Sequence, residues 1–296
     1  MTRLTGFPRF LMCAPAHFDV DYEINPWMKG NLGQVDHRLA ATQFAGLRDA
    51  LSDGAHGAEL EWVEPVDGLP DMVFTANAGL LLGRSFVPSN FAHPQRQGER
   101  EPFARWFATR GWQVLDMPAS LSFEGAGDAL FDSASARLWM GHGFRTDRGA
   151  ADWLAQALAP IEPGIEVVPL HLVDPRYYHL DTCFCPLADG GLLWNPSAFD
   201  DASRAAVMAR VDASRRIEVD ADDAARFACN AVSFGHTVVL GQVSDRLVAQ
   251  LAARGLAAVR VPLGEFMKAG GSAKCLTLRL DAGDLAWRHQ PQPLAA

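Results

Sequence analysis

Cys275 has a sequence context that suits a nucleophile. It follows the pair Gly270-Gly271, and Lys274 directly precedes it. Glycines let backbone amides approach a ligand closely, and a nearby positive charge favours the thiolate, which is the reactive form of cysteine. Because buried cysteines are more often inert packing, the residues alone leave both a nucleophile and a core position open here.

His179 and Asp181 form a His-x-Asp pair in the segment 177–185. If this segment is a strand, His179, Asp181, Cys183 and Cys185 share one face. That face could present an imidazole for proton transfer and a carboxylate to one ligand, although His179 could equally be structural. A metal site built from the four side chains is the alternative. We predict no metal, because one strand rarely surrounds a tetrahedral ion and no second ligand pair is evident.

Glu124 and Asp128 lie in a glycine-rich acidic turn with the sequence Phe-Glu-Gly-Ala-Gly-Asp. Carboxylates in such a turn could orient an imidazole or form an ion pair with a cation. A solvated loop would have the same composition, so the turn alone does not identify a function.

Three further side chains could contact a ligand. Asn77 is an amide in an otherwise apolar run and needs a hydrogen-bond partner if it is buried, either in the backbone or in a ligand. Arg96 and Arg145 carry guanidinium groups that suit a carboxylate ligand, although most single arginines are surface charges.

The elements that must position these residues repeat along the chain. A 3.6-residue apolar period predicts helices over 36–53, 99–110, 149–159, 200–211 and 244–254. A β-rich run follows each helix, at 58–63, 111–115, 164–168, 216–219 and 258–261. Each run leads to a polar motif, and most of these motifs lead to another apolar strand and the next helix.

The polar motifs recur at similar intervals. The markers Asn77, Glu124, His179, Asn230 and Cys275 are separated by 47, 55, 51 and 45 residues. This repeat predicts ββαβ units arranged around a central pocket, with the strand 275–280 pairing beside 9–13 to complete a ring. The polar motifs would then converge on one pocket. A doubly wound α/β sheet is the alternative that the spacing leaves open.

Length and composition restrict the class of protein. The chain has 296 residues, of which 49% are hydrophobic, and a net charge of −9. We expect a single domain over 1–296, with 282–296 as a tail, and no nucleic-acid partner, because the chain lacks a positive field. Five cysteines without a CxxC pair favour a reducing cytoplasm, and no apolar run is long enough for a membrane span.

Together, four motifs resemble those of the guanidine-modifying enzymes, which include arginine deiminase, dimethylarginine dimethylaminohydrolase, the amidinotransferases and the arginine dihydrolases. The motifs are Phe-Thr-Ala-Asn at 74–77, Phe-Glu-Gly at 123–125, His-x-Asp at 179–181, and Gly-Gly before Cys at 270–275. The resemblance extends from about residue 9 to 281. It implies a five-bladed α/β propeller that needs neither a metal nor an organic cofactor.

The resemblance also implies roles for individual residues. Cys275 would be the nucleophile, His179 the general acid and base, and Glu124 the carboxylate that orients His179. The implied substrate contacts are Asp128 and Asp181 to the guanidinium or α-amino group, Arg96 and Arg145 to the α-carboxylate, and Asn25 within a lid-like loop over 14–35.

Asn77 departs from the pattern of most relatives. Deiminases and dimethylarginine hydrolases usually carry an Asp there, whereas the arginine dihydrolases resemble this chain in carrying Asn. An amide both donates and accepts hydrogen bonds, so it could hold a neutral ureido group as well as a guanidinium. We therefore expect an arginine dihydrolase that hydrolyses citrulline again to give ornithine, ammonia and CO2.

Other functions remain open at this stage. They are a dimethylarginine hydrolase or arginine deiminase that stops at citrulline, an amidinotransferase, and a non-catalytic arginine-binding protein. The expected partner is a small molecule, arginine or a substituted arginine, and the sequence leaves a homo-oligomer open.

Overall fold

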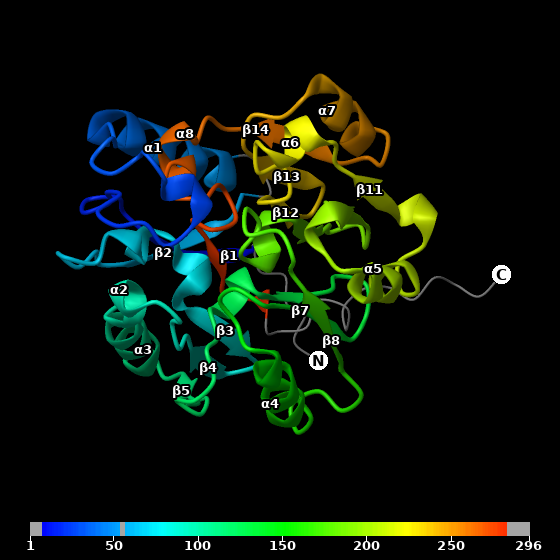
Figure 1. Cartoon of the computed structure of the whole chain (residues 1–296), viewed down its shortest axis with the longest axis horizontal. Coiled ribbons are helices and arrows are strands. Elements are labelled where there is room, and N and C mark those ends of the chain that lie inside the picture. The colour runs from blue at the N-terminus through cyan, green and yellow to red at the C-terminus, as the bar shows by residue number, and fades with distance from the viewer. Residues whose placement is uncertain (1–7, 54–56, 283–296) are drawn as a thin grey trace.

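The computed structural model describes residues 8–53 and 57–282, which form five three-stranded sheets (Figure 1). Of the predicted tail at 282–296, residues 283–296 lie outside the described residues. In chain order the sheets contain β3 (Gly79–Leu82), β4 (Ser85–Pro88) and β5 (Gln113–Val114); β6 (Ala129–Phe131), β7 (Arg137–His142) and β8 (Glu166–His171); β9 (Phe184–Pro186), β10 (Leu192–Trp194) and β11 (Arg216–Glu218); β12 (Val232–Phe234), β13 (Thr237–Leu240) and β14 (Ala257–Arg260); and β15 (Leu278–Arg279), β1 (Arg9–Cys13) and β2 (Glu59–Val63).

All five sheets have the same internal topology. The middle strand pairs antiparallel with one neighbour and parallel with the other. Because parallel strands need a crossover, a helix connects each parallel pair. The five crossover helices are α1 (His37–Ser52), α3 (Arg100–Ala108), α4 (Arg148–Leu158), α5 (Asp201–Met208) and α7 (Asp245–Ala252). The predicted helices and ββαβ units are therefore confirmed.

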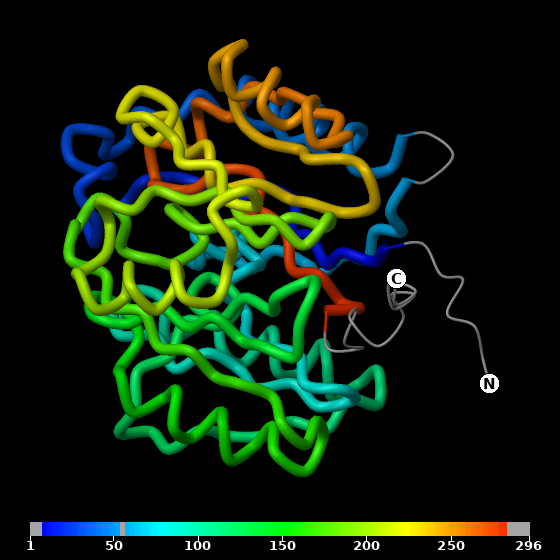
Figure 2. Tube along the Cα trace, turned by 90° about the vertical axis from the view of Figure 1, so that its right-hand side faces the viewer, coloured from blue at the N-terminus to red at the C-terminus, as the bar shows by residue number. Residues whose placement is uncertain are grey.

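One sheet combines the two ends of the described chain. β15 pairs antiparallel with β1, with Leu278 opposite Leu11, and Figure 2 shows this C-terminal segment beside the N-terminal strand. The pairing agrees with the prediction, but the strand is shorter than 275–280. Residues before β15 form a turn, in which Leu276 N–H bonds the Ser272 carbonyl and Thr277 N–H bonds the Lys274 carbonyl.

The helices lie around the outside of the molecule and the strands lie nearer its centre (Figure 1). α7 illustrates how the sequence specifies such a helix. The Ser244 hydroxyl caps its first turn by accepting from Leu247 N–H, and Leu247 and Leu251 point into the core. None of the helices in the described ranges is long and apolar enough to cross a bilayer.

Short helical segments complete the fold. The α-helical ones are α2 (Pro94–Gln97), α6 (Ala221–Ala224) and α8 (Gly264–Met267). The 3-10 helices are η1 (Pro26–Met28), η2 (Pro70–Val73), η3 (Thr75–Ala78), η4 (Gly125–Gly127), η5 (Leu180–Thr182), η6 (Pro196–Ala198) and η7 (Ala213–Arg215).

A polar turn precedes the first strand of every unit. In three units it is a 3-10 helix, namely η3, η4 and η5, and in the other two it is an irregular turn before β12 or β15. These turns carry Asn77, Glu124, His179, Asn230 and Cys275 in that order, so the five sequence markers occupy equivalent places in the fold.

Gly125 allows two of these turns to approach each other. Its φ is +62°, and a Cβ built there would lie 2.7 Å from the backbone N of Gly79. We expect Gly125→Ala to lower the free energy of unfolding by about 2–4 kcal/mol, because it adds a backbone clash to left-handed strain. Gly68→Ala is the control. Gly68 has a φ of +78°, and a Cβ built there would have no atom within 4 Å, so Gly68→Ala should lower the free energy of unfolding by only roughly 1–2 kcal/mol. Equal losses in urea denaturation would contradict this account.

Candidate active site

Hydrogen bonds join the first three polar turns directly. Asn77 Nδ2 donates to the Glu124 carbonyl at 3.2 Å, and the Glu124 carboxylate lies 2.7 Å from His179 Nε2. These residues come from three separate units, and all three are buried. The sequence prediction that these motifs converge is therefore confirmed.

The remaining turns continue the series. Asn230 Nδ2 donates to the Asp181 carbonyl at 3.1 Å and to Cys275 Sγ at 3.0 Å. The carbonyl of Cys275 accepts from Ala76 N–H at 3.1 Å, which brings the series back to the turn of Asn77. Each polar turn thus bonds to the next, and the last bonds to the first.

Cys275 is 2% exposed, and its sulfur lies between a donor and an acceptor. Asn230 Nδ2 donates to Sγ, and the thiol donates to Asp181 Oδ2 at 3.5 Å. Burial and the neighbouring Asp181 raise the pKa of Cys275 well above that of a free thiol, and hydrogen bonds from the Ser272 backbone and Asn230, together with Lys274, offset only part of this. The cysteine is therefore a neutral thiol at neutral pH.

Glu124 is an ionised carboxylate although it is fully buried. Burial alone would raise its pKa, but Arg145 at 3.0 Å and the hydrogen bond to His179 hold that pKa far below its usual range. Burial lowers the pKa of His179 to about 4 against the opposing effect of Glu124, so the imidazole is neutral at pH 7. Because an ionised carboxylate only accepts, Nε2 carries the proton and Nδ1 is a free base.

Two buried aspartates flank this pair. Asp128 accepts from Leu180 N–H at 2.9 Å and from the Thr146 hydroxyl at 2.6 Å, and burial raises its pKa well above the ordinary value. Burial also raises the pKa of Asp181 to about 6, with Lys274 opposing. A bound cation would favour ionisation of both carboxyl groups.

Arg96 and Arg145 are buried and already engaged with protein groups. Arg96 donates to both carboxylate oxygens of Glu99, at 2.7 and 2.8 Å, and to Asn77 Oδ1 at 3.1 Å. Arg145 bonds Glu124 and the carbonyl of Ile24 at 2.9 Å. A contact of either arginine with a substrate carboxylate therefore stays a prediction.

The predicted lid-like loop over 14–35 contacts the site at several points. Asn25 caps η1 by accepting from Trp27 N–H and Met28 N–H, and its Nδ2 donates to the Ala269 carbonyl at 3.0 Å. Tyr22 donates to Asp71 at 2.9 Å. Because the side-chain amide of Asn25 already bonds to protein groups, a substrate contact by Asn25 stays a prediction.

The structure corrects the predicted strand over 177–185. His179 is the cap residue directly before η5, and only 184–186 form a strand, so His179, Asp181, Cys183 and Cys185 do not share a strand face. Thr182 N–H bonds the His179 carbonyl, which coils the chain there. Cys183 packs into a hydrophobic cluster, and Cys185 donates to the Ala231 carbonyl. In the described part of the chain no His, Cys, Asp and Glu cluster suits a metal ion.

Sequence reasoning missed Asn230, Asp71 and Glu99 as members of the site. Asn230 served only as a repeat marker, although its place in the repeat could have identified it. Asp71 is 2% exposed, and its Oδ1 has no hydrogen-bond partner among the described residues. Burial raises the pKa of Asp71 above its ordinary value, and burial raises the pKa of Glu99 to about 7. Neither acid has a sequence context that would have distinguished it from a surface carboxylate.

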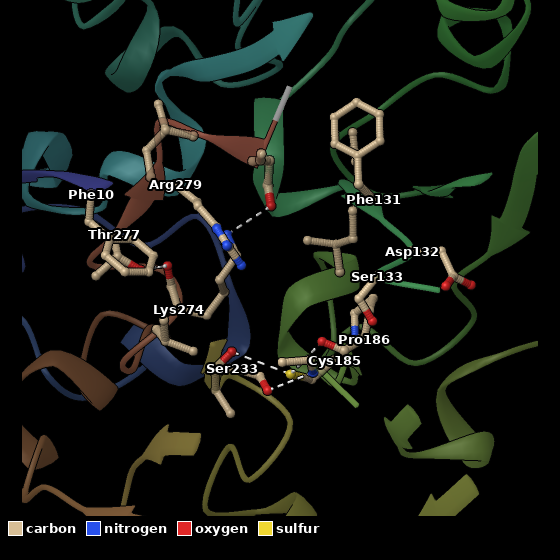
Figure 3. Close-up of a pocket in the computed structure, with 18 of the residues that line it drawn as sticks. Phe10, Phe131, Asp132, Ser133, Cys185, Pro186, Ser233, Lys274, Thr277 and Arg279 are labelled. Atoms are coloured by element: carbon tan, nitrogen blue, oxygen red, sulfur yellow. Dashed lines mark hydrogen bonds between the residues drawn. The ribbon is translucent and has the colours of Figure 1, made fainter. Parts of the chain in front are cut away.

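The structure also modifies the predicted central pocket. A cavity of about 300 Å³ adjoins the polar turns, but Cys275, His179 and Glu124 do not line it. Figure 3 shows Lys274 and Arg279 on one side of this cavity and Asp132 on the other. The Lys274 ammonium donates to the Ala126 carbonyl at 3.2 Å.

Comparison with known proteins supports one family. A family model described as N,N dimethylarginine dimethylhydrolase, eukaryotic, matches residues 18–281. The chain is 39% identical over 272 residues to N(G),N(G)-dimethylarginine dimethylaminohydrolase of Mycobacterium tuberculosis, covering 92% of this chain and 85% of that protein.

Two further relatives are arginine dihydrolases. The bifunctional arginine dihydrolase/ornithine cyclodeaminase AgrE of Nostoc sp. is 47% identical over 277 residues, which cover 94% of this chain but only 38% of AgrE. The crystal structure of the N-terminal domain of ArgZ, a cyanobacterial arginine dihydrolase, superposes with a TM-score of 0.88 at 46% identity and covers 92% of this chain and 98% of that domain. The chain thus belongs to the dimethylarginine dimethylaminohydrolase family, within the guanidine-modifying superfamily.

Proposed function

We propose that this chain is an arginine dihydrolase that acts through a covalent intermediate on Cys275. The observation that carries the proposal is the hydrogen-bonded series Glu124–His179 and Asp181–Cys275–Asn230, which supplies a base, a carboxylate and a thiol in one buried cluster. The relatives AgrE and ArgZ, which are named for this activity, support it. Because the chain spans only 38% of AgrE, the proposal covers the dihydrolase reaction alone.

Buried carboxyl groups would recognise the cationic guanidinium. Asp181 and Asp128 have pKa values that burial raises, so each gains ionisation when a cation arrives. Asp71 offers a carboxylate oxygen without a partner in the described structure, and it suits the same cation or the α-amino group. A guanidinium next to Asp181 would also offset the main charge that opposes the Cys275 thiolate.

In the first chemical step, the thiol proton passes to the neutral imidazole of His179 and the thiolate attacks the guanidinium carbon. A C–S bond forms, the C–N bond to the terminal nitrogen breaks, and the imidazolium gives its proton to the departing ammonia. The Glu124 carboxylate orients the imidazole and stabilises the imidazolium. The result is an S-alkylthiouronium on Cys275.

In the second step, neutral His179 accepts a proton from water, which attacks the same carbon. The C–S bond breaks, citrulline forms, and the thiol of Cys275 regains a proton. Binding of citrulline and a repeat of both steps would release a second ammonia and leave a carbamate, which decomposes to ornithine and CO2. In total, arginine and two waters give ornithine, two ammonia and CO2.

Asn77 supports the second round. Its Oδ1 accepts from Arg96 and its Nδ2 donates to the Glu124 carbonyl, which fixes the amide and leaves one N–H and one lone pair for a ligand. A neutral group of this kind can pair with a ureido oxygen, which a carboxylate would repel. The family model favours a dimethylarginine hydrolase as the second candidate, because the same cysteine chemistry would release dimethylamine.

We also propose that the five sheets close into a five-bladed propeller and that residues 14–35 act as a lid. The return of the hydrogen-bonded series from Cys275 to Ala76 and the pairing of β15 with β1 support closure. The contacts of Arg145 with Ile24 and of Tyr22 with Asp71 support a lid that senses the bound substrate.

The five cysteines are all free thiols, which fits the cytoplasm that we propose as the site of action. A homo-oligomer remains open.

Removal of either central group should stop or slow the chemistry. We expect no ammonia release from arginine with Cys275→Ala, and a loss of 10²–10⁴-fold in kcat with His179→Ala, the usual contribution of positioned proton transfer. Circular dichroism should show that both variants fold. Wild-type turnover that persists in folded Cys275→Ala would exclude the covalent mechanism.

Asn77→Asp should release citrulline instead of ornithine. A carboxylate at this position favours a guanidinium over a neutral ureido group, so we expect the citrulline to ornithine ratio to rise by at least about 10-fold, which corresponds to about 1.4 kcal/mol. Chromatography of products from arginine measures the ratio. Asn195→Asp is the control, because Asn195 is a buried cap of η6 whose Oδ1 accepts from Ser197. An unchanged ratio in Asn77→Asp would assign the second round to another residue.

Asp181→Asn should make Cys275 ionise at lower pH in the free protein. Asp181 is the main charge that raises the pKa of Cys275. Asp181 itself is ionised above about pH 6, so it carries its negative charge throughout the higher pH range in which the thiol titrates. We therefore expect the midpoint of iodoacetamide alkylation to move down the pH axis, while turnover of arginine falls because a guanidinium contact is lost. Cys275→Ser identifies labelling at other cysteines. A midpoint that moves upward or stays fixed would contradict this electrostatic account.

A further inference from the structure

We propose that Asn230 is a positioning residue that holds the Cys275 sulfur and ties the nucleophile's turn to the turn of His179. The inference builds on the proposed function, because it concerns the same thiol. It rests on a buried side chain, with 0% exposure, whose amide touches both turns.

Backbone groups fix the orientation of the Asn230 amide. Its Oδ1 accepts from the N–H groups of Ser272 and Cys275, both at 3.1 Å. Because backbone N–H groups can only donate, the oxygen must face them. The amide nitrogen must then face Sγ of Cys275 and the carbonyl of Asp181. The N–H to sulfur direction therefore follows from the bonding pattern and not from an arbitrary choice between the two amide atoms.

The amide uses all of its bonding capacity. Two lone pairs accept from the turn of Cys275, one N–H reaches Sγ at 3.0 Å, and the other reaches the Asp181 carbonyl at 3.1 Å. One side chain thus fixes the backbone of the nucleophile, the position of its sulfur and the turn that begins at His179. No shorter or charged residue type reproduces these four bonds.

The hydrogen bond to sulfur also affects the protonation state of Cys275. An N–H donor stabilises the thiolate more than the thiol, since hydrogen bonds to charged groups are the stronger ones. Asp181 on the other side of the sulfur has the opposite effect. Asn230 therefore offsets Asp181 at the moment when the thiolate forms, in addition to setting the angle from which sulfur reaches the guanidinium carbon.

Asn230→Asp separates these roles. A carboxylate keeps the shape and can still accept from Ser272 and Cys275, but it cannot donate to sulfur and it adds a negative charge. We expect kcat for arginine to fall by about 10- to 100-fold with little change in KM, as for loss of one charge-assisted hydrogen bond. We also expect the alkylation midpoint of Cys275 in the free protein to move to higher pH. Asn195→Asp, the same change at a helix cap, should leave both measurements unchanged.

Because the charge added by Asn230→Asp raises the thiol pKa by itself, Asn230→Ala, which removes the donor without adding a charge, is the deciding variant and should also move the alkylation midpoint to higher pH. A merely structural Asn230 would lower the melting temperature and the amount of active protein in Asn230→Ala while the alkylation midpoint stayed at the wild-type pH, and that outcome would overturn the proposal. The alkylation assay does not require turnover. An upward shift in a protein that does not hydrolyse arginine would retain the role of Asn230 and reject the proposed function instead.

A measurement on the wild-type chain covers the case in which the variant does not fold. Alkylation of Cys275 by iodoacetamide should shift the side-chain ¹⁵N–¹H signals of Asn230 and leave those of Asn195 in place. In Asn195→Asp the side-chain signals of Asn195 disappear, which assigns that pair in the wild-type spectrum. Signals of Asn230 that do not respond to alkylation would exclude the bond to sulfur.

Discussion

The structure depends on the requirement that buried polar groups find partners where water is absent. The turns before β3, β6, β9, β12 and β15 carry amides, carboxylates and backbone groups into the interior. Each turn satisfies its polar groups on the next one, from Asn77 to Glu124 and on to Cys275 and Ala76. The hydrogen bonds that hold the sheets in place are therefore the same bonds that assemble the reactive groups.

Burial also sets the electrostatic state of the site. Glu124 stays ionised because Arg145 and His179 bond it, whereas burial raises the pKa values of Asp71, Asp128 and Asp181. The site therefore holds several carboxyl groups that gain from the arrival of a cation. Cys275 is neutral for the same reason, so the charge that activates the sulfur would come from the ligand. In the proposed mechanism, such a thiol would stay protonated until a cationic substrate is bound.

The repeat explains how much of this arrangement the sequence predicted. Helical periodicity located all five crossover helices, because each buries one apolar stripe, and α1, α5 and α7 also begin at a side-chain cap, such as Ser244 for α7. The similar spacing of the polar motifs predicted that the turns of Glu124, His179 and Cys275 converge, because each motif occupies the same place in its unit. The pairing of β15 with β1 followed from the same count.

The errors came from local structure that tertiary contacts decide. Residues 177–185 alternate like a strand, yet the hydrogen bonds of Thr182 and Asp128 coil the chain around His179. Asn230 and Asp71 have no unusual neighbours in sequence, and only their contacts across units make them members of the site. The arginines could be identified as candidate ligands, but their pairing with Glu99 and Glu124 depends on packing that the sequence does not reveal.

The sheet made of β15, β1 and β2 has a consequence for biosynthesis. During synthesis, the strand that pairs with the open edge of β1, together with the cysteine three residues before that strand, is made some 270 residues after β1. A nascent chain that ends after β14 contains the strands of four sheets but lacks both Cys275 and β15. In the proposed mechanism, a product truncated before this segment would therefore contain most of the strands and lack the nucleophile.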